Sequence, residues 1–229
     1  RCTRPITVND LASSFWRRGL AAARYLFTRG GQMASNGNLA NVYVKSSSEI
    51  DRPDLLITLQ AWCTDEQLKP QPFSGFTIMV EHLRPKASGS VHIRSADPSA
   101  APQILFNFFR EEKDREALVN GLAIARRIAS APAMRAMIKS PLVDDLDRLD
   151  GEDLANHARS HGLSLLHPTS SCRMGIDRNS VVDSALRVRG VGNLRVVDAS
   201  VMPMIPSGNT NAPSVMIAER ASDLIRIDH

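Results

Sequence analysis

Asp54-Leu-Leu-Ile-Thr-Leu-Gln-Ala61 is a short apolar stretch that follows Pro53 and precedes a polar loop. Its β-branched and aliphatic residues favour a β-strand. Two more stretches, 75–83 and 90–94, have the same character, and the connection Arg-Pro-Lys-Ala-Ser-Gly between them is rich in turn-forming residues. A connection of this kind is typical of antiparallel pairs. We therefore expect an antiparallel sheet in this part of the chain.

Segments with helical character surround these strands. The clearest is 111–130, which begins with acidic residues and carries Arg126 and Arg127 near its end. The other expected elements are helices at 8–28, 153–160 and 213–227, strands at 41–45 and 101–109, and an acidic linker over 141–150. Strands and helices occur in blocks and do not alternate strictly. This order predicts an α+β fold, in which helices cover an antiparallel sheet.

The composition excludes several classes of protein. The chain has 229 residues, of which 43% are hydrophobic and 23% are charged, and these values are ordinary for a globular domain. Disordered, collagen-like and disulfide-scaffold proteins are therefore excluded. The net charge is only +4, and no basic run or aromatic-interleaved patch is present. The sequence argues against nucleic acid as a partner.

The cysteines and the hydropathy indicate a compartment. Cys2, Cys63 and Cys172 are few, odd in number and widely spaced, so they form neither a metal-ligand pattern nor a disulfide framework. No stretch is apolar enough for a transmembrane span, and no signal peptide is recognisable. We therefore expect a cytoplasmic protein. Because the chain begins with Arg-Cys-Thr and not with Met, we expect it to be processed or to be part of a longer protein.

Three features in the last third of the chain carry chemistry. His167 stands alone in Leu-Leu-His-Pro-Thr-Ser-Ser-Cys-Arg-Met-Gly, and spacing alone favours a packed or surface histidine there. The apolar stretch 193–197 ends in Asp198, which is a weak sign of a polar group at the end of a strand. The turn 207–213, Ser-Gly-Asn-Thr-Asn-Ala-Pro, leads into the last expected helix, whose N-terminus can receive an anion. An ordinary helix cap explains the same turn.

Taken together, these features closely resemble the C-terminal signature of the glucose–methanol–choline (GMC) family of FAD-dependent oxidoreductases. Upstream segments are similar to the substrate domain of the same family. The matching pieces are His-Pro-Thr-Ser-Ser-Cys-Arg-Met-Gly from His167, Ser180-Val-Val-Asp183, Leu186-Arg-Val188, Leu194 to Pro203, Gly208 to Ala221, Arg52-Pro-Asp-Leu55, Leu83-Arg-Pro85 to Gly89, Asp97-Pro98 and Asp114. The resemblance therefore covers nearly the whole chain.

The resemblance implies an activity and a site. It implies FAD-dependent oxidation of a small-molecule alcohol to an aldehyde or ketone, in which His167 is the acid/base group and hydride passes to flavin N5. Asn209 would hold the same substrate oxygen. The cofactor-binding residues would be Asp198, Ala199, Asn209, Thr210 and Asn211, and the helix N-terminus at 211–214 would stabilise the reduced flavin.

The chain departs from the family pattern at two places. Many relatives have Gly-Thr where this sequence has Ser170-Ser171, so a turn that favours glycine is lost. The family's G-x-G-x-x-G fingerprint is also missing, because the nearest match, Gly190-Val-Gly192, has no third glycine. We therefore expect the C-terminal part of a bacterial enzyme that resembles choline and alcohol dehydrogenases, with the N-terminal FAD-binding half as its partner.

The expected domains follow from the same resemblance. Residues 1–160 would form the substrate-binding domain, and residues 161–229 would form the active-site segment and closing helix that complete an FAD-binding α/β domain. Trp62 and Phe73 could line the substrate pocket, although aromatic residues on strands usually pack in a core. Two alternatives remain open. The chain could be catalytically silent without a separate FAD-binding half, and the family also includes a lyase that does not use its flavin for redox chemistry.

Overall fold

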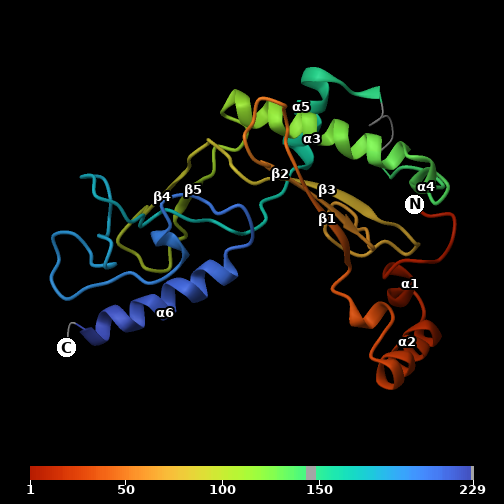
Figure 1. Cartoon of the computed structure of the whole chain (residues 1–229), viewed down its shortest axis with the longest axis horizontal. Helices are drawn as coiled ribbons and strands as arrows, with labels where there is room; N and C mark the ends of the chain where they lie inside the picture. The colour runs from red at the N-terminus through yellow and green to blue at the C-terminus, as the bar shows by residue number, and fades with distance from the viewer. Residues whose placement is uncertain (143–147, 228–229) are drawn as a thin grey trace. The chain divides into compact units, whose positions relative to one another are not determined.

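The computed structural model describes residues 1–142 and 148–227 (Figure 1). The middle of the acidic linker expected over 141–150 lies outside the described residues. Within the part of the chain that the structure describes, no helix is long and apolar enough to cross a membrane.

The chain folds as two compact units. Unit 1 comprises Arg1–His82 and Arg115–Ser160, and unit 2 comprises Leu83–Asp114 and His161–His229. The two domains and their functions that the sequence analysis assigned remain predictions.

Unit 1 is built on a three-stranded antiparallel sheet. Its strands are β1 (Asn38–Val44), β2 (Leu55–Gln60) and β3 (Thr77–His82), and β2 lies between the other two. The first four residues of β2 are buried. The apolar stretch that predicted a strand thus forms the centre of the sheet, since a central strand with apolar neighbours on both sides buries the most surface.

Helix α3 (Glu112–Ser130) lies against this sheet (Figure 1). Its glycine, Gly121, makes the close approach possible: a Cβ atom at this position would lie 2.5 Å from Cγ1 of Val80 and 3.1 Å from Cδ1 of Leu55. Any larger residue would push the helix away from β2 and β3. The prediction of an α+β fold with a helix on an antiparallel sheet is therefore confirmed.

The helix expected over 8–28 is interrupted, and this expectation was wrong. The structure has α1 (Asn9–Ala12) and α2 (Phe15–Thr28) in its place. Ser13 donates its hydroxyl to the backbone carbonyl of Asp10 at 3.2 Å. Ser14 is extended and caps α2 by accepting the backbone N–H of Arg17 at 3.4 Å. Serine side chains compete with helical backbone bonds in this way, so two consecutive serines break the helix.

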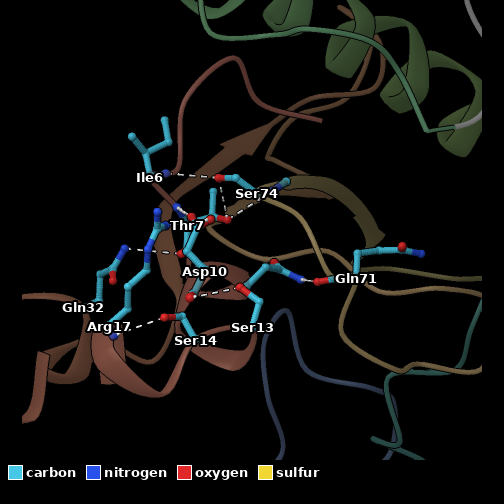
Figure 2. Close-up of polar contacts among 11 residues, drawn as sticks. Ile6, Thr7, Asp10, Ser13, Ser14, Arg17, Gln32, Gln71 and Ser74 are labelled. Carbon is cyan, nitrogen blue, oxygen red and sulfur yellow. Dashed lines mark hydrogen bonds and ion pairs between the residues drawn. The ribbon is translucent and has the colours of Figure 1, made fainter. Parts of the chain in front are cut away.

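Polar side chains bind the N-terminal segment to the rest of unit 1 (Figure 2). The backbone N–H of Thr7 donates to Oδ2 of Asp10 at 2.9 Å, and the hydroxyl groups of Thr7 and Ser74 are 3.1 Å apart. Asn9 donates to the carbonyls of Cys63 and Gln71 at 2.8 and 2.9 Å. These side chains are mostly buried and satisfied, so we interpret the cluster as structural.

In unit 2, β4 (Ser90–His92) pairs antiparallel with β5 (Gln103–Leu105). The antiparallel pairing of 75–83 with 90–94 that the sequence indicated is therefore wrong, since β3 pairs with β2. Buried Asp114 accepts the backbone N–H groups of Lys86 and Ala87 at 2.8 Å each. The backbone after β3 is thereby bound to a carboxylate and does not form a hairpin.

The remaining elements are short or terminal. Strand β5 is shorter than the expected 101–109, because Asn107 and Phe109 adopt left-handed backbone conformations with φ of 56° and 63°. The last helix begins two residues earlier than expected. The elements not yet named are the helices α4 (Pro132–Arg135), α5 (Gly151–His161) and α6 (Asn211–Ile227), and the 3-10 turns η1 (Gln32–Ala34) and η3 (Ala199–Val201).

One apolar core joins the loops of unit 2 to α6. Its buried members are Val182, Leu186, Val201, Met202, Ile217 and Ala221. Val201 belongs to η3, and Ile217 and Ala221 belong to α6. Val201 is fully buried, so the hydrophobic effect fixes η3 against the helix.

Candidate active site

The segment that carries His167 is anchored on η3. The backbone N–H of Cys172 donates to the carbonyl of Ser200 at 3.0 Å, and that of Met174 donates to the carbonyl of Val201 at 2.8 Å. Because Val201 is packed against α6, these two bonds attach the histidine segment to the same helix. The position of His167 is thus set by the core of unit 2.

The backbone is strained on both sides of the His-Pro-Thr piece. Leu166 has φ of 58° and Ser170 has φ of 73°. Both values lie in the left-handed region, which disfavours residues with a Cβ atom. At Ser170 the loop therefore adopts the conformation that favours glycine, although the residue is serine. Strain of this kind is often found where a side chain is held for function, and Leu166 directly precedes His167.

Both ring nitrogens of His167 face polar side chains at the start of α6. Its Nδ1 lies 3.0 Å from Oγ1 of Thr210, and its Nε2 lies 2.8 Å from Nδ2 of Asn209. The ring is half-buried and Asn209 is exposed. The structure therefore brings together the two residues to which the resemblance assigns catalysis. The contact with Thr210 was not anticipated, because the sequence does not indicate which side chain faces Nδ1.

The N-terminus of α6 is suited to an anionic group. The helix has 17 residues, and its first turn contains no acidic side chain. The aligned backbone dipoles place partial positive charge at this end, and the first N–H groups of a helix have no partners within it. Asn211, which the resemblance assigns to the cofactor, is the first residue of the helix. These features fit an electron-rich flavin ring beside His167 and Asn209.

Asp198 and Ala199 lie at the start of η3. The Asp198 carboxylate caps this turn by accepting the backbone N–H of Ser200 at 2.8 Å, and it also accepts the Ser200 hydroxyl. The carboxylate is therefore engaged within its own turn. A contact of this segment with FAD through the backbone stays a prediction.

Trp62 and Phe73 belong to unit 1. Trp62 is half-buried, and the guanidinium carbon of Arg1 lies 4.8 Å from the centre of the Phe73 ring. Their role in a substrate pocket stays a prediction. Among residues 1–142 and 148–227, no group of three His, Cys, Asp or Glu side chains is arranged to hold a metal ion.

An ion pair closes the loop that follows the histidine segment. Arg173 donates to both carboxylate oxygens of Asp177 at 2.8 and 2.7 Å. This hydrogen-bonded guanidinium holds the pKa of Asp177 well below its usual range, and the backbone N–H of Asn179 adds to the effect. The pair stabilises the turn between the anchored residue Met174 and the buried Val182.

Comparison with known proteins places this geometry in a family. A family model described as GMC oxidoreductase matches residues 85–218, which is more than half of the chain. An alcohol dehydrogenase [acceptor] of Pseudomonas putida is 39% identical over 94% of this chain and 39% of its own length. An oxygen-dependent choline dehydrogenase of Pseudomonas syringae pv. tomato is 34% identical over 98% of this chain and 40% of its own length. The chain thus spans about 40% of the length of these relatives.

Solved structures agree on the fold. A variant of Aspergillus oryzae formate oxidase, studied for its FAD modification, superposes with a TM-score of 0.83 at 23% identity, over 100% of this chain and 45% of that one. A pyridoxine 4-oxidase from Mesorbium loti superposes with a TM-score of 0.76 at 22% identity, over 84% of this chain and 38% of that one. The family model, which matches more than half of the chain, shows that the chain belongs to the GMC oxidoreductase family.

Proposed function

We propose that the chain supplies the catalytic side chains of an FAD-dependent enzyme that oxidises an alcohol to an aldehyde or ketone. The observation that carries this proposal is the contact of His167 Nε2 with the Asn209 amide, 2.8 Å apart, directly before α6. The names of two relatives, alcohol dehydrogenase and choline dehydrogenase, support a CH–OH donor as the substrate.

His167 and Asn209 can act on the same alcohol oxygen. An alcohol hydroxyl that replaces the Asn209 amide at Nε2 of His167 donates its proton to that atom, because imidazole is a base near neutral pH. The Asn209 amide carries two N–H donors and can give one of them to the alcohol oxygen. As the proton leaves, negative charge grows on that oxygen, and the amide stabilises it without changing its own charge. FAD, when bound, supplies the acceptor for the hydride from the alcohol carbon.

The start of α6 would receive the cofactor. Its positive end would stabilise the negative charge that the reduced flavin ring carries. Asn209, Thr210 and Asn211 would lie along the ring, and the backbone of Asp198 and Ala199 would follow the chain that leads to the phosphates. The absence of acidic side chains from the first turn of α6 supports this placement.

We further propose that tight FAD binding requires polypeptide beyond these residues. The chain spans about 40% of the length of these two relatives. Its sequence also lacks the glycine fingerprint that binds the pyrophosphate. The partner would be the N-terminal FAD-binding half of the same enzyme. The alternative function follows from the same observations: the chain would be catalytically silent on its own.

We also propose a cytoplasmic location. Cys2 and Cys63 are buried free thiols, and Cys172 is a half-buried free thiol. Unpaired thiols are typical of a reducing compartment. Detection of any disulfide among these residues in protein isolated without reductant would contradict this location.

The test is a flavin absorbance measurement without oxygen. The chain is assembled with the FAD-binding portion of the Pseudomonas putida relative, loaded with FAD and mixed with choline or with primary aliphatic alcohols. We expect at least one alcohol to bleach the band of oxidised flavin. If a flavin-loaded assembly is bleached by dithionite but by no alcohol, the proposed oxidation is wrong. The chain alone, titrated with FAD, should retain none after gel filtration.

A further inference from the structure

We infer that Thr210 is a positioning residue that holds neutral His167 as its Nδ1–H tautomer. The hydroxyl Oγ1 of Thr210 lies 3.0 Å from Nδ1. With the ring proton on Nδ1, the lone pair stays on Nε2, which is the atom that faces Asn209. The consequence for catalysis rests on the proposed function, whereas the tautomer itself does not.

The contacts of the ring indicate where its proton lies. In the structure Nδ2 of Asn209 is the amide atom that faces Nε2, at 2.8 Å, and because an amide nitrogen is a donor only, we infer that it donates to Nε2. Neutral imidazole carries one N–H and one lone pair, so an accepting Nε2 places the proton on Nδ1. The group that can accept this proton is the hydroxyl oxygen of Thr210. The two side chains together select one tautomer.

Thr210 is held firmly enough for this role. Its backbone carbonyl accepts the backbone N–H of Ser214 at 3.0 Å and the Ser214 hydroxyl at 2.7 Å. These bonds fix the residue at the entrance to α6, and a β-branched side chain has few rotamers. The hydroxyl is thus attached to a long helix and not to a free loop. This role differs from the contact with FAD that the resemblance assigned to Thr210.

Without the Thr210 hydroxyl, His167 would no longer be restricted to the Nδ1–H tautomer. Without an acceptor beside Nδ1, the ring proton can move to Nε2 and donate to the amide oxygen of Asn209 once that amide has turned over. The Nε2 lone pair is then lost, and the ring cannot accept the alcohol proton at that atom. Thr210 therefore acts through His167.

The direct test is the tautomer of His167 by ¹⁵N NMR, on this chain without cofactor. The chain has six histidines, so the signals of His167 are assigned by their loss in His167→Gln. The spectra are recorded at about pH 8.5, where imidazole is ordinarily neutral. We expect Nδ1–H in the wild type and in Thr210→Ser, and a substantial fraction of Nε2–H in Thr210→Val, which keeps the shape but lacks the hydroxyl. Nε2–H in the wild type, or an unchanged tautomer in Thr210→Val, would overturn the inference.

A kinetic test follows on the assembled, FAD-loaded protein. Thr210→Val should lower the rate of flavin reduction roughly fivefold to tenfold, the scale of one hydrogen bond, with little change in the alcohol concentration for half-saturation. Thr210→Ser should restore most of the rate. Ser222→Ala is the matched control. It removes a hydroxyl on α6, and that hydroxyl donates to the backbone carbonyl of Ala218. If the rate depends on His167, a Thr210→Val rate equal to that of the wild type would contradict the inference. A rate independent of His167 would contradict the proposed function alone.

Discussion

The Asn209 amide nitrogen lies 2.8 Å from Nε2 of His167, although the two residues are 42 positions apart in the sequence. The two residues are held close together by η3, which contacts the segments that carry both of them. The histidine segment is bonded to η3 through Ser200 and Val201, and Val201 is packed in the core that includes α6. Asn209 stands just before that helix. The geometry of the pair is therefore set by apolar packing, and only its chemistry is set by the two polar side chains.

Asn209→Ala tests whether Asn209 contributes less to the reaction than His167 does. We expect the rate of flavin reduction by an alcohol to fall about tenfold, because the amide stabilises the oxygen but does not take its proton. Stopped-flow absorbance of the assembled protein measures this rate. A loss as large as that of His167→Ala would mean that the amide is as essential as the base.

Ser170→Gly should stabilise the protein. Ser170 has φ of 73°, and a residue with a Cβ atom in this region is strained by about 1 kcal/mol. We expect the free energy of unfolding to rise by roughly 0.5 kcal/mol, since glycine also gains freedom in the unfolded chain. Urea denaturation measures the change. Ser171→Gly is the control, because Ser171 is not in the left-handed region, and it should lower stability. A destabilised Ser170→Gly variant would show that the hydroxyl contact with Thr169 outweighs the strain.

Asp198→Ala should loosen the turn on which the histidine segment is anchored. The Asp198 carboxylate accepts the backbone N–H of Ser200 at 2.8 Å, and loss of such a cap costs about 1 kcal/mol. Asp198→Asn keeps an oxygen acceptor and should behave nearly like the wild type. Thermal unfolding of the three proteins checks the order. Equal melting temperatures for all three would mean that the cap contributes nothing to stability.

The Arg173–Asp177 pair predicts a pH dependence. The Arg173 guanidinium holds the folded-state pKa of Asp177 well below its usual range. A carboxyl with a depressed pKa stabilises the fold above its unfolded pKa of about 3.9, and this stability is lost as the pH falls toward the folded value. Asp177→Asn should therefore lower the melting temperature at neutral pH. The difference from the wild type should shrink below about pH 4.

The same difference should also shrink in concentrated salt, since both side chains are partly exposed. Melting curves at several pH values and salt concentrations test both expectations. A difference that stays constant from neutral pH to strong acid would mean that the ion pair does not contribute.

Several elements could be predicted from the sequence because their signals are local. The apolar stretch at β2, and the acidic start and basic end of α3, lie within single segments and indicated their own structures. The break at Ser13 and Ser14 was missed because serine hydroxyls can either face solvent or bind the backbone. The pairing of β3 was missed because strand partners are chosen by burial, which a turn-rich connection does not reveal.

In the candidate site, too, local sequence signals did not reveal which residues pair. Spacing gave no partner for His167, and only the resemblance to the GMC family connected it with Asn209. The loop at Ser170 keeps the left-handed conformation that the serine was expected to abolish. The structure adds what neither source contained, which is the contact of Nδ1 with Thr210. Such contacts arise from tertiary packing between distant segments, and no local pattern encodes them.

His167 is the proposed base for alcohol oxidation. The most direct measurement is the rate at which an alcohol bleaches the flavin of the assembled protein without oxygen, for the wild type and for His167→Ala with equal FAD content. Loss of the proposed base should lower this rate roughly a hundredfold or more. A His167→Ala variant that reduces its flavin at the wild-type rate would show that His167 is not the base.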